Sequence, residues 1–147
     1  MDVRLYKGEG TIKLIAYYPY ALATFSPTVR NKETGPINNV GDLNAQLKIS
    51  FDEAHVAYLQ KMWLEDLKGN TIGELNIEDV VLQNDDKYIL FDSSTHLVEG
   101  LNENYKKTGN LYNKYITTGD FFEAPVGRTI FKANTQFARM TYTPLYY

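Results

Sequence analysis

The chain has 147 residues, of which 44% are hydrophobic and 22% charged, and its net charge is −3. This length suits one domain of about 100–200 residues, and the composition excludes a disordered, collagen-like or low-complexity chain. No cysteine is present, which excludes disulfides, zinc–thiolate sites and cysteine nucleophiles. The acidic balance argues against nucleic acid as a partner, and no apolar run is long enough to predict a membrane span.

Alternating apolar and polar side chains predict most of the elements. A strand is expected over 11–17, ended by Pro19. Residues 26–44 hold two prolines, two glycines and a series of asparagines, so we expect a loop or linker there. Further strands are expected over 45–51, 77–82 and 87–91, the last two joined by a polar turn at 83–86. Residues 128–133 and 137–143 predict a closing hairpin around 134–136. Short strands at this spacing indicate an antiparallel sandwich or barrel.

The segment from Asp52 to Leu67 allows two interpretations. Its apolar residues have helical spacing, with Asp52 as a candidate N-cap and Gly69 as a candidate stop. The alternative is a strand that ends near Leu67, a turn at 68–70 and a return strand from Ile72. Local periodicity favours the helix, whereas agreement with the rest of the chain favours the hairpin.

Residues suited to catalysis are few. His55 and His96 are the two histidines, and neither lies in a metal-binding spacing or beside a serine in a G-x-S-x-G motif. The glycines near the N-terminus lack the third glycine of a dinucleotide-binding fingerprint. Residues 75–105 contain seven acidic residues and one basic residue, Lys87, which indicates a solvated rim or, alternatively, an acidic interaction surface. We therefore predict no enzyme activity, no metal and no cofactor.

The chain contains 12 tyrosines, an unusual number that fits both strands and surfaces with one wet side. Binding is expected from surface shape and aromatic rings, with Tyr105, Tyr112 and Tyr115 as candidates in the loop-rich stretch 102–118. The alternative is that these tyrosines hold the loop on the domain. Trp63 and exposed tyrosines could stack on sugar rings, and core packing is the alternative for Trp63.

Three stretches resemble one protein family. Residues 6–21 read YKGEGTIKLIAYYPYA, residues 88–98 read YILFDSSTHLV, and the third stretch contains TGDFFEAPVGRTI at 118–130 and MTYTPLYY at 140–147. They are similar, in this order, to motifs of the distal tail proteins of long-tailed phages and prophages of Gram-positive bacteria. The pattern departs from the family at Arg128 and Thr129, which replace a polar–Asn pair, and at Leu145, which replaces a common arginine.

The resemblance implies an all-β architecture with a galectin-like or jelly-roll-like antiparallel β-sandwich. Residues 1–23 would be the last strand and linker of an N-terminal ring-forming domain, 24–40 a linker or loop, and 41–147 the C-terminal sandwich. It also favours the hairpin over 59–76. Tyr17, Tyr18 and Tyr20 would then offer an exposed apolar patch that favours self-association.

The function implied is that of a structural component of a tail tip or baseplate, located in the virion tail and assembled in the cytoplasm of the host bacterium. Its partners would be other tail and baseplate proteins, such as the tail tube and tail-associated or receptor-binding proteins. Self-association is also expected, as a hexameric ring in the full-length family. The alternative is a carbohydrate-binding module that contacts glycans of the host cell wall.

Hydrophobic positions on the expected strands predict the core. One of Ile130 and Phe131 should point outward, because neighbours on a strand face opposite sides. The predicted core residues are Leu47, Ile49, Phe51, Val81, Ile89, Phe91, Phe121, Ile130, Phe131, Met140 and Tyr142.

Overall fold

The computed structural model describes residues 21–22, by their backbone, and 28–146. Within these residues the chain is almost entirely antiparallel β-structure. The strands are β1 (Ala21–Leu22), β2 (Thr28–Asn39), β3 (Leu43–Asp52), β4 (Lys61–Glu65), β5 (Thr71–Ile77), β6 (Tyr88–Asp92), β7 (Leu97–Leu101), β8 (Lys107–Leu111), β9 (Ile116–Gly119) and β10 (Gly127–Tyr146). A one-turn helix, α1 (Glu53–Val56), and a 3-10 turn, η1 (Asn113–Tyr115), complete the elements.

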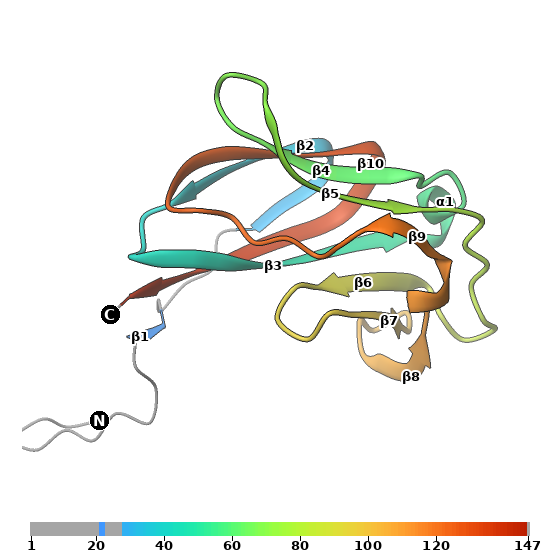
Figure 1. The fold of residues 1–147 in the computed structure, drawn as a ribbon. Coiled ribbons are helices and arrows are strands. Elements are labelled where there is room, and N and C mark those ends of the chain that lie inside the picture. Colours follow the sequence, from blue (N-terminus) through green and yellow to red (C-terminus); the bar gives the residue numbers. More distant parts are fainter. Residues whose placement is uncertain (1–20, 23–27, 147) are drawn as a thin grey trace, which may run out of the picture.

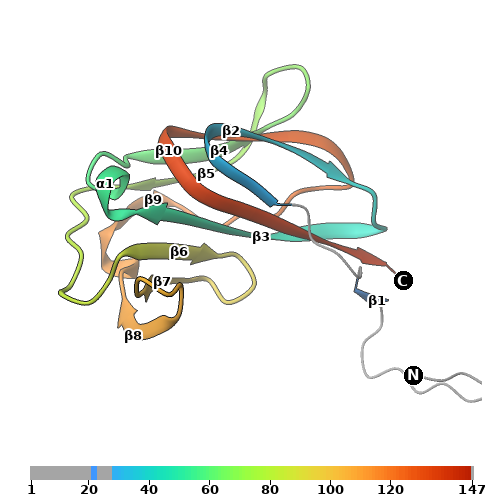
Figure 2. The same cartoon turned by 180° about the vertical axis from the view of Figure 1, so that it is seen from behind.

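The long strand β10 belongs to both layers of the fold. Along one edge it pairs with β4 through its first half and with β3 through its second half. Its other edge pairs with β2 and then with β1. The strands β4, β5 and β9 continue one layer, and β3, β6, β7 and β8 continue the other (Figures 1 and 2). The sheet therefore curls around one core, which confirms the all-β, sandwich-like prediction.

A bend in β10 lets it pass from one layer to the other. Lys132 pairs with Thr34 and Phe137 with Lys32, so residues 133–136 face a single residue of β2. Such a bulge bends a strand and increases its twist. The Asn134 side chain holds the bend: its Oδ1 accepts hydrogen bonds from the backbone N–H groups of residues 60 and 61, at 2.7 and 2.8 Å. The predicted hairpin around 134–136 is thus wrong, because the polar residues mark a corner within one strand.

The predicted loop across 26–44, and with it the linker at 24–40, is wrong for Thr28–Asn39. These residues form β2, which pairs with β10 along most of its length. Pro36 is compatible with this strand because no described strand pairs with its other edge, where a missing N–H costs nothing. Ile37 and Asn39 are buried, so the sandwich begins before residue 41.

The strand predicted over 77–82 is also wrong. β5 ends at Ile77, and Val81 is 67% exposed. β5 and β6 lie in different layers, so the segment between them crosses from one layer to the other and is not a hairpin turn. Val81 consequently does not belong to the core, in contrast to its predicted place there.

Both interpretations of the segment after residue 52 are correct in part. Asp52 caps α1, accepting a hydrogen bond from the His55 N–H at 3.0 Å, but the helix lasts only one turn. β4 and β5 then form the hairpin, and Gly69 in its loop has a φ of 87°, a conformation that favours glycine. The hairpin over 59–76 is confirmed.

The core lies between the two layers and agrees with most of the prediction. Phe121 and Ile130 are only partly buried. Phe131 is fully buried while Ile130 faces outward, which confirms the expected alternation. The remaining predicted residues are buried: Leu47, Ile49, Phe51, Ile89, Phe91, Phe131, Met140 and Tyr142.

Candidate interaction surface

Cross-strand pairing brings one row of side chains together on the outer face of the β7–β6–β3–β10–β2 layer. Along this row Glu99 pairs with Leu90, Leu90 with Ser50, Ser50 with Arg139, and Arg139 with Arg30. Their strand neighbours, including Ile49, Phe91 and Met140, lie in the core. Because successive side chains of a strand point to opposite faces, the row points away from the core.

Tyr105, in the turn between β7 and β8, lies across this row. Its hydroxyl donates a hydrogen bond to Ser50 Oγ, and its ring makes an edge contact with Tyr88 at 5.1 Å between centroids. The Arg139 guanidinium lies 4.1 Å from the centroid of the same ring, within cation–π range. Burial raises the pKa of Tyr105, against the Ser50 hydrogen bond and the positive charges of Arg139 and Arg30. The ring is therefore held in place, with both arginines near it.

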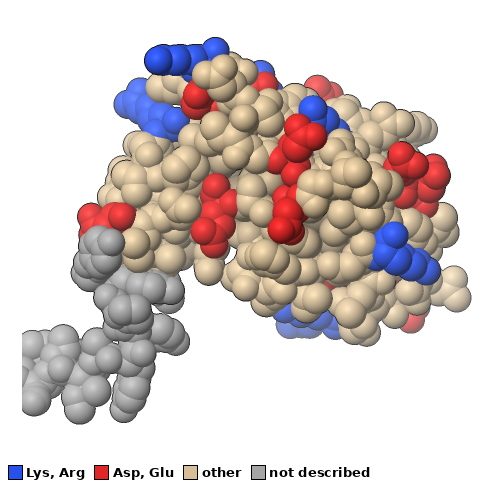
Figure 3. Space-filling model, in the orientation of Figure 1, with Lys and Arg blue, Asp and Glu red and all other residues tan. Residues whose placement is uncertain are grey.

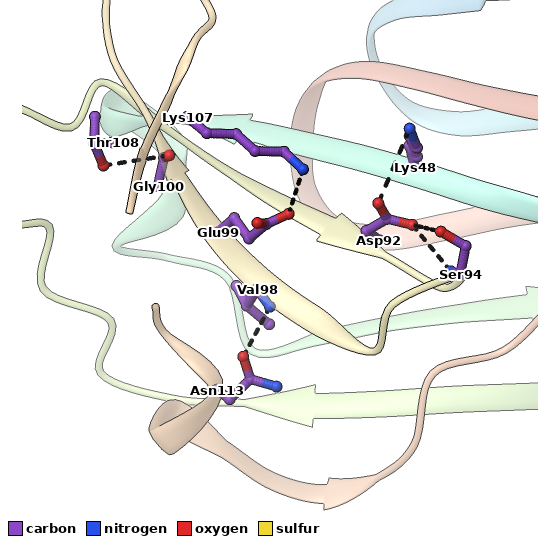
Figure 4. Close-up of polar contacts among 9 residues, drawn as sticks. All are labelled: Lys48, Asp92, Ser94, Val98, Glu99, Gly100, Lys107, Thr108 and Asn113. Carbon is purple, nitrogen blue, oxygen red and sulfur yellow. Dashed lines mark hydrogen bonds and ion pairs between the residues drawn. The ribbon is translucent and has the colours of Figure 1, made fainter. Parts of the chain in front are cut away.

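The carboxylates on this face are matched by lysines. Asp92 lies 3.9 Å from Lys48 Nζ and accepts two hydrogen bonds from Ser94, from its N–H at 2.9 Å and its hydroxyl at 2.6 Å (Figure 4). Glu99 Oε1 lies 3.2 Å from Lys107 Nζ (Figure 4). No described carboxylate forms an ion pair with either arginine of the row. Arg30 and Arg139, which face each other across β2 and β10, thus have no counter-charge among the residues that the structure describes.

A second polar cluster surrounds Asp86, which is 2% exposed. Its carboxylate accepts hydrogen bonds from Thr108 Oγ1 at 2.5 Å, from Asn110 Nδ2 at 3.1 Å and from the Tyr112 hydroxyl. Burial raises the pKa of Asp86, but these three donors outweigh it and leave the pKa below its ordinary value. Every partner belongs to the segment of β8 and the residues after it, so the cluster fastens that segment to the chain before β6.

Tyr112 completes this cluster and is a structural residue. It is 1% exposed, and its hydroxyl also accepts a hydrogen bond from the Gln83 N–H at 2.9 Å. Burial and then the hydrogen bond to Asp86 raise the pKa of Tyr112 to about 12. A buried ring offers no surface to a partner, so these contacts favour the alternative interpretation, in which Tyr112 holds the loop on the domain. The predicted solvated rim is likewise wrong for Asp86 and Asp92, each 2% exposed.

The other predicted binding residues lie apart from one another. Tyr115 is partly buried, stacked on Tyr112 at 6.2 Å, with Lys114 Nζ 5.2 Å from its ring centroid. Tyr105 is the candidate that lies on the outer face beside Arg139 and Arg30. Tyr17, Tyr18 and Tyr20 fall outside the described residues. Arg30 and Arg139 are not among the residues predicted from the sequence. Residue 30 falls in the segment predicted to be a loop, and only the strand register shows that the two arginines meet.

The two histidines occupy separate places. His55 Nδ1 lies 2.7 Å from Asp52 Oδ1, beside the cap of α1. His96 is exposed and stacks on Phe121, with 5.1 Å between ring centroids. Across residues 28–146, no three His, Asp or Glu side chains gather in a way that could hold a metal ion. The same described residues include no helix with the length and apolarity needed to cross a membrane.

Comparison with known proteins shows a likeness among solved structures. No family model matches the sequence, and no curated protein matches it. Among solved structures, the fold is similar to that of the Dit protein (gp 19.1) of SPP1, described as a paradigm of the hub adsorption apparatus in phages that infect Gram-positive bacteria. The TM-score is 0.64 at 12% sequence identity, and the match covers 89% of this chain and 50% of that chain. The chain spans half the length of this neighbour, and it has a phage tail-hub-like fold.

Proposed function

We propose that the chain is a structural component of a phage or prophage tail tip or baseplate, acting as the C-terminal sandwich of a distal tail protein in protein–protein assembly. The observation that carries the proposal is the fold likeness to SPP1 Dit over 89% of the chain. The ordered motifs at 6–21, 88–98 and 118–147, which resemble distal tail proteins, support it independently. The partners proposed are other tail and baseplate proteins, together with further copies of the full-length protein in a ring.

Immunogold electron microscopy of particles from the strain that encodes the chain tests this role. Antibodies raised against residues 28–146 should label the end of the tail distal to the head. Particles from a strain lacking the gene serve as the control and should carry no gold. Labelling spread evenly over heads and tail shafts, or labelling absent from intact particles, would contradict a tail-tip role.

Trp63 favours a second candidate function, binding of host cell-wall carbohydrate. Its strand neighbours Met62 and Leu64 are buried, whereas Trp63 itself is partly exposed on the outer face of β4, so core packing does not account for it. Its Nε1–H donates a hydrogen bond to Glu65 at 2.7 Å, and Lys61 Nζ lies 5.1 Å from the ring centroid. An indole amid polar groups on a sheet face is suited to the apolar face of a sugar.

Sedimentation with purified cell walls separates the two candidates. A carbohydrate-binding role predicts saturable binding that Trp63→Ala abolishes, while Tyr58→Ala, which removes a 69% exposed ring elsewhere, leaves it unchanged. Wild-type protein that stays in the supernatant at every wall concentration would eliminate the second candidate and leave the assembly role as it stands.

A further inference from the structure

Arg30 and Arg139 break a local rule of sheet stability. They lie directly opposite each other on β2 and β10, where Cβ atoms stand about 4.5–5.5 Å apart and like charges destabilise the pair. The chain as a whole is acidic, with 18 acidic against 15 basic residues. On the face seen in Figure 3, carboxylates spread across the middle, whereas Lys and Arg lie mostly toward the outline. Two facing arginines that no carboxylate between residues 28 and 146 pairs with are therefore a local exception.

The surroundings hold at least one of these charges in place. The Arg139 guanidinium lies over the ring of Tyr105, whose hydroxyl is hydrogen-bonded to the buried Ser50. A guanidinium over an aromatic ring keeps N–H groups that can donate hydrogen bonds. Arg30 is exposed across the strand pair. Together they present two planar donors from neighbouring strands of a rigid sheet.

This chemistry selects carboxylates carried by a protein. Each arginine guanidinium can bind a carboxylate or a phosphate group by two parallel hydrogen bonds. Phosphate sites commonly add free backbone N–H groups at a helix N-terminus or a nest, but here Arg30 and Arg139 lie within paired strands. Arginine and tyrosine are the residues enriched at the centres of protein–protein interfaces. The combination of Arg30, Arg139 and Tyr105 has that composition.

We propose that Arg30 and Arg139, supported by Tyr105, form a docking site for an acidic segment of a partner protein. Carboxylates of that segment supply a counter-charge that the described residues do not provide, and they relieve the mutual repulsion of the two arginines. The choice of a protein as the occupant rests on the assembly role proposed above, whereas the affinity for carboxylates rests on the arginine pair alone.

Fluorescence anisotropy with labelled hexaglutamate as the probe tests the site at low ionic strength, where screening is weak. The wild-type chain should bind the probe saturably, and the double variant Arg30→Gln/Arg139→Gln should bind about ten-fold more weakly or worse, because bidentate charge-assisted contacts are lost. Lys68→Gln/Arg128→Gln is the control with the same change of net charge at exposed positions elsewhere, and it should weaken binding by less than about two-fold, the size expected for a screened, distant charge.

Three results of the binding assay would overturn the proposal. They are the absence of saturable binding, equal weakening in the control variant, and tighter binding of tripolyphosphate than of hexaglutamate, which would assign the arginines to a phosphate-bearing polymer. Each variant must fold, and the double variant should melt at or above the temperature of the wild type, because the repulsion between the arginines is removed. If Arg139→Gln fails to fold, Arg139→Lys, which retains the charge and loses the bidentate geometry, takes its place and should also weaken binding. Gold-labelled tail tips that assemble normally with the double variant would refute this site and leave the tail role intact. Hexaglutamate binding by a chain that immunogold labelling does not find in tails would support the docking site and contradict the tail role.

Discussion

Replacing Asp86 by alanine removes the acceptor at the centre of a buried cluster. Three donors lose their partner: the Thr108 hydroxyl, the Asn110 amide and the Tyr112 hydroxyl. Each hydrogen bond to a charged group contributes about 1.5–3 kcal/mol, but the three act as one network, and the variant no longer incurs the cost of burying a carboxylate. Each unsatisfied buried donor costs about 1–3 kcal/mol, so with part of this offset we expect a loss of about 3–5 kcal/mol.

This loss is large for a domain whose total stability is about 5–15 kcal/mol. For a domain of this size, each kcal/mol lowers Tm by about 2–4 °C, so Tm should fall by about 6–20 °C. Circular dichroism during thermal and urea unfolding measures both quantities. Asp86→Asn should lose less, because its amide oxygen in the place of Oδ2 still accepts from Asn110 and Tyr112, and the Thr108 hydroxyl can turn to accept from its NH₂.

Asp85→Ala is the matched control, since Asp85 is the exposed neighbour of Asp86. A surface substitution of this kind should change stability by no more than about 0.5 kcal/mol. If Asp86→Ala melted within the error of the control, the carboxylate would contribute no net stability, and the assignment of the cluster as the fastening of β8 would be refuted.

Four further outcomes are expected. Folding lowers the pKa of Asp86, so its contribution to the free energy of unfolding is complete above the ordinary aspartate pKa and is lost as pH falls through the pKa of the folded state. Acid unfolding followed by fluorescence should show this dependence in the wild type and not in Asp86→Asn. The pKa of Tyr112 is raised to about 12, so its contribution is complete below the ordinary tyrosine pKa and is lost as pH rises toward about 12; alkaline denaturation should lose that component in Tyr112→Phe, and identical curves would contradict it. Asn134→Ala frees two backbone N–H groups at the bend of β10 and should cost about 1 kcal/mol in urea unfolding, because this site is exposed and water replaces part of the bonding. Gly41→Ala places a methyl group against the backbone of Leu145 and should cost about 1–3 kcal/mol, whereas Gly69→Ser, in an open loop, should be strained only by its positive φ.

Strand alternation was a reliable guide where one face of a strand is buried and the other is polar. β3 has this pattern, whereas β6 is a short apolar run that is buried on both faces, and the predicted ranges of both lie within a residue or two of their ends. β2 does not have the alternating pattern, because most of its first half is exposed and the strand is rich in turn-favouring residues. Its strand conformation comes from pairing with β10, a partner about a hundred residues away in the sequence, which no local pattern can reveal.

The candidate surface was predictable only through its aromatic component. Tyr105 stood out because it lies in a loop rich in tyrosine and lysine. The arginines that give the surface its charge are ordinary in sequence, and they meet only because β2 and β10 pair in one particular register. Tyr112 could not be distinguished from Tyr105 by sequence, because both lie in the same loop-rich stretch. The structure separates them, since the Tyr112 hydroxyl is hydrogen-bonded to the buried carboxylate of Asp86.

The position of β10 in the chain has a consequence for synthesis. This strand pairs with β1, β2, β3 and β4, and both layers are joined through it. A nascent chain that has emerged from the ribosome only as far as residue 126 therefore holds strands that still lack their common neighbour. Sheets that depend on such distant pairings fold slowly and expose unpaired edges until the last strand arrives. The domain should thus become resistant to protease late and in a single step, when residues 127–146 leave the exit tunnel. Until then the strand edges stay unpaired, and chaperones can bind them.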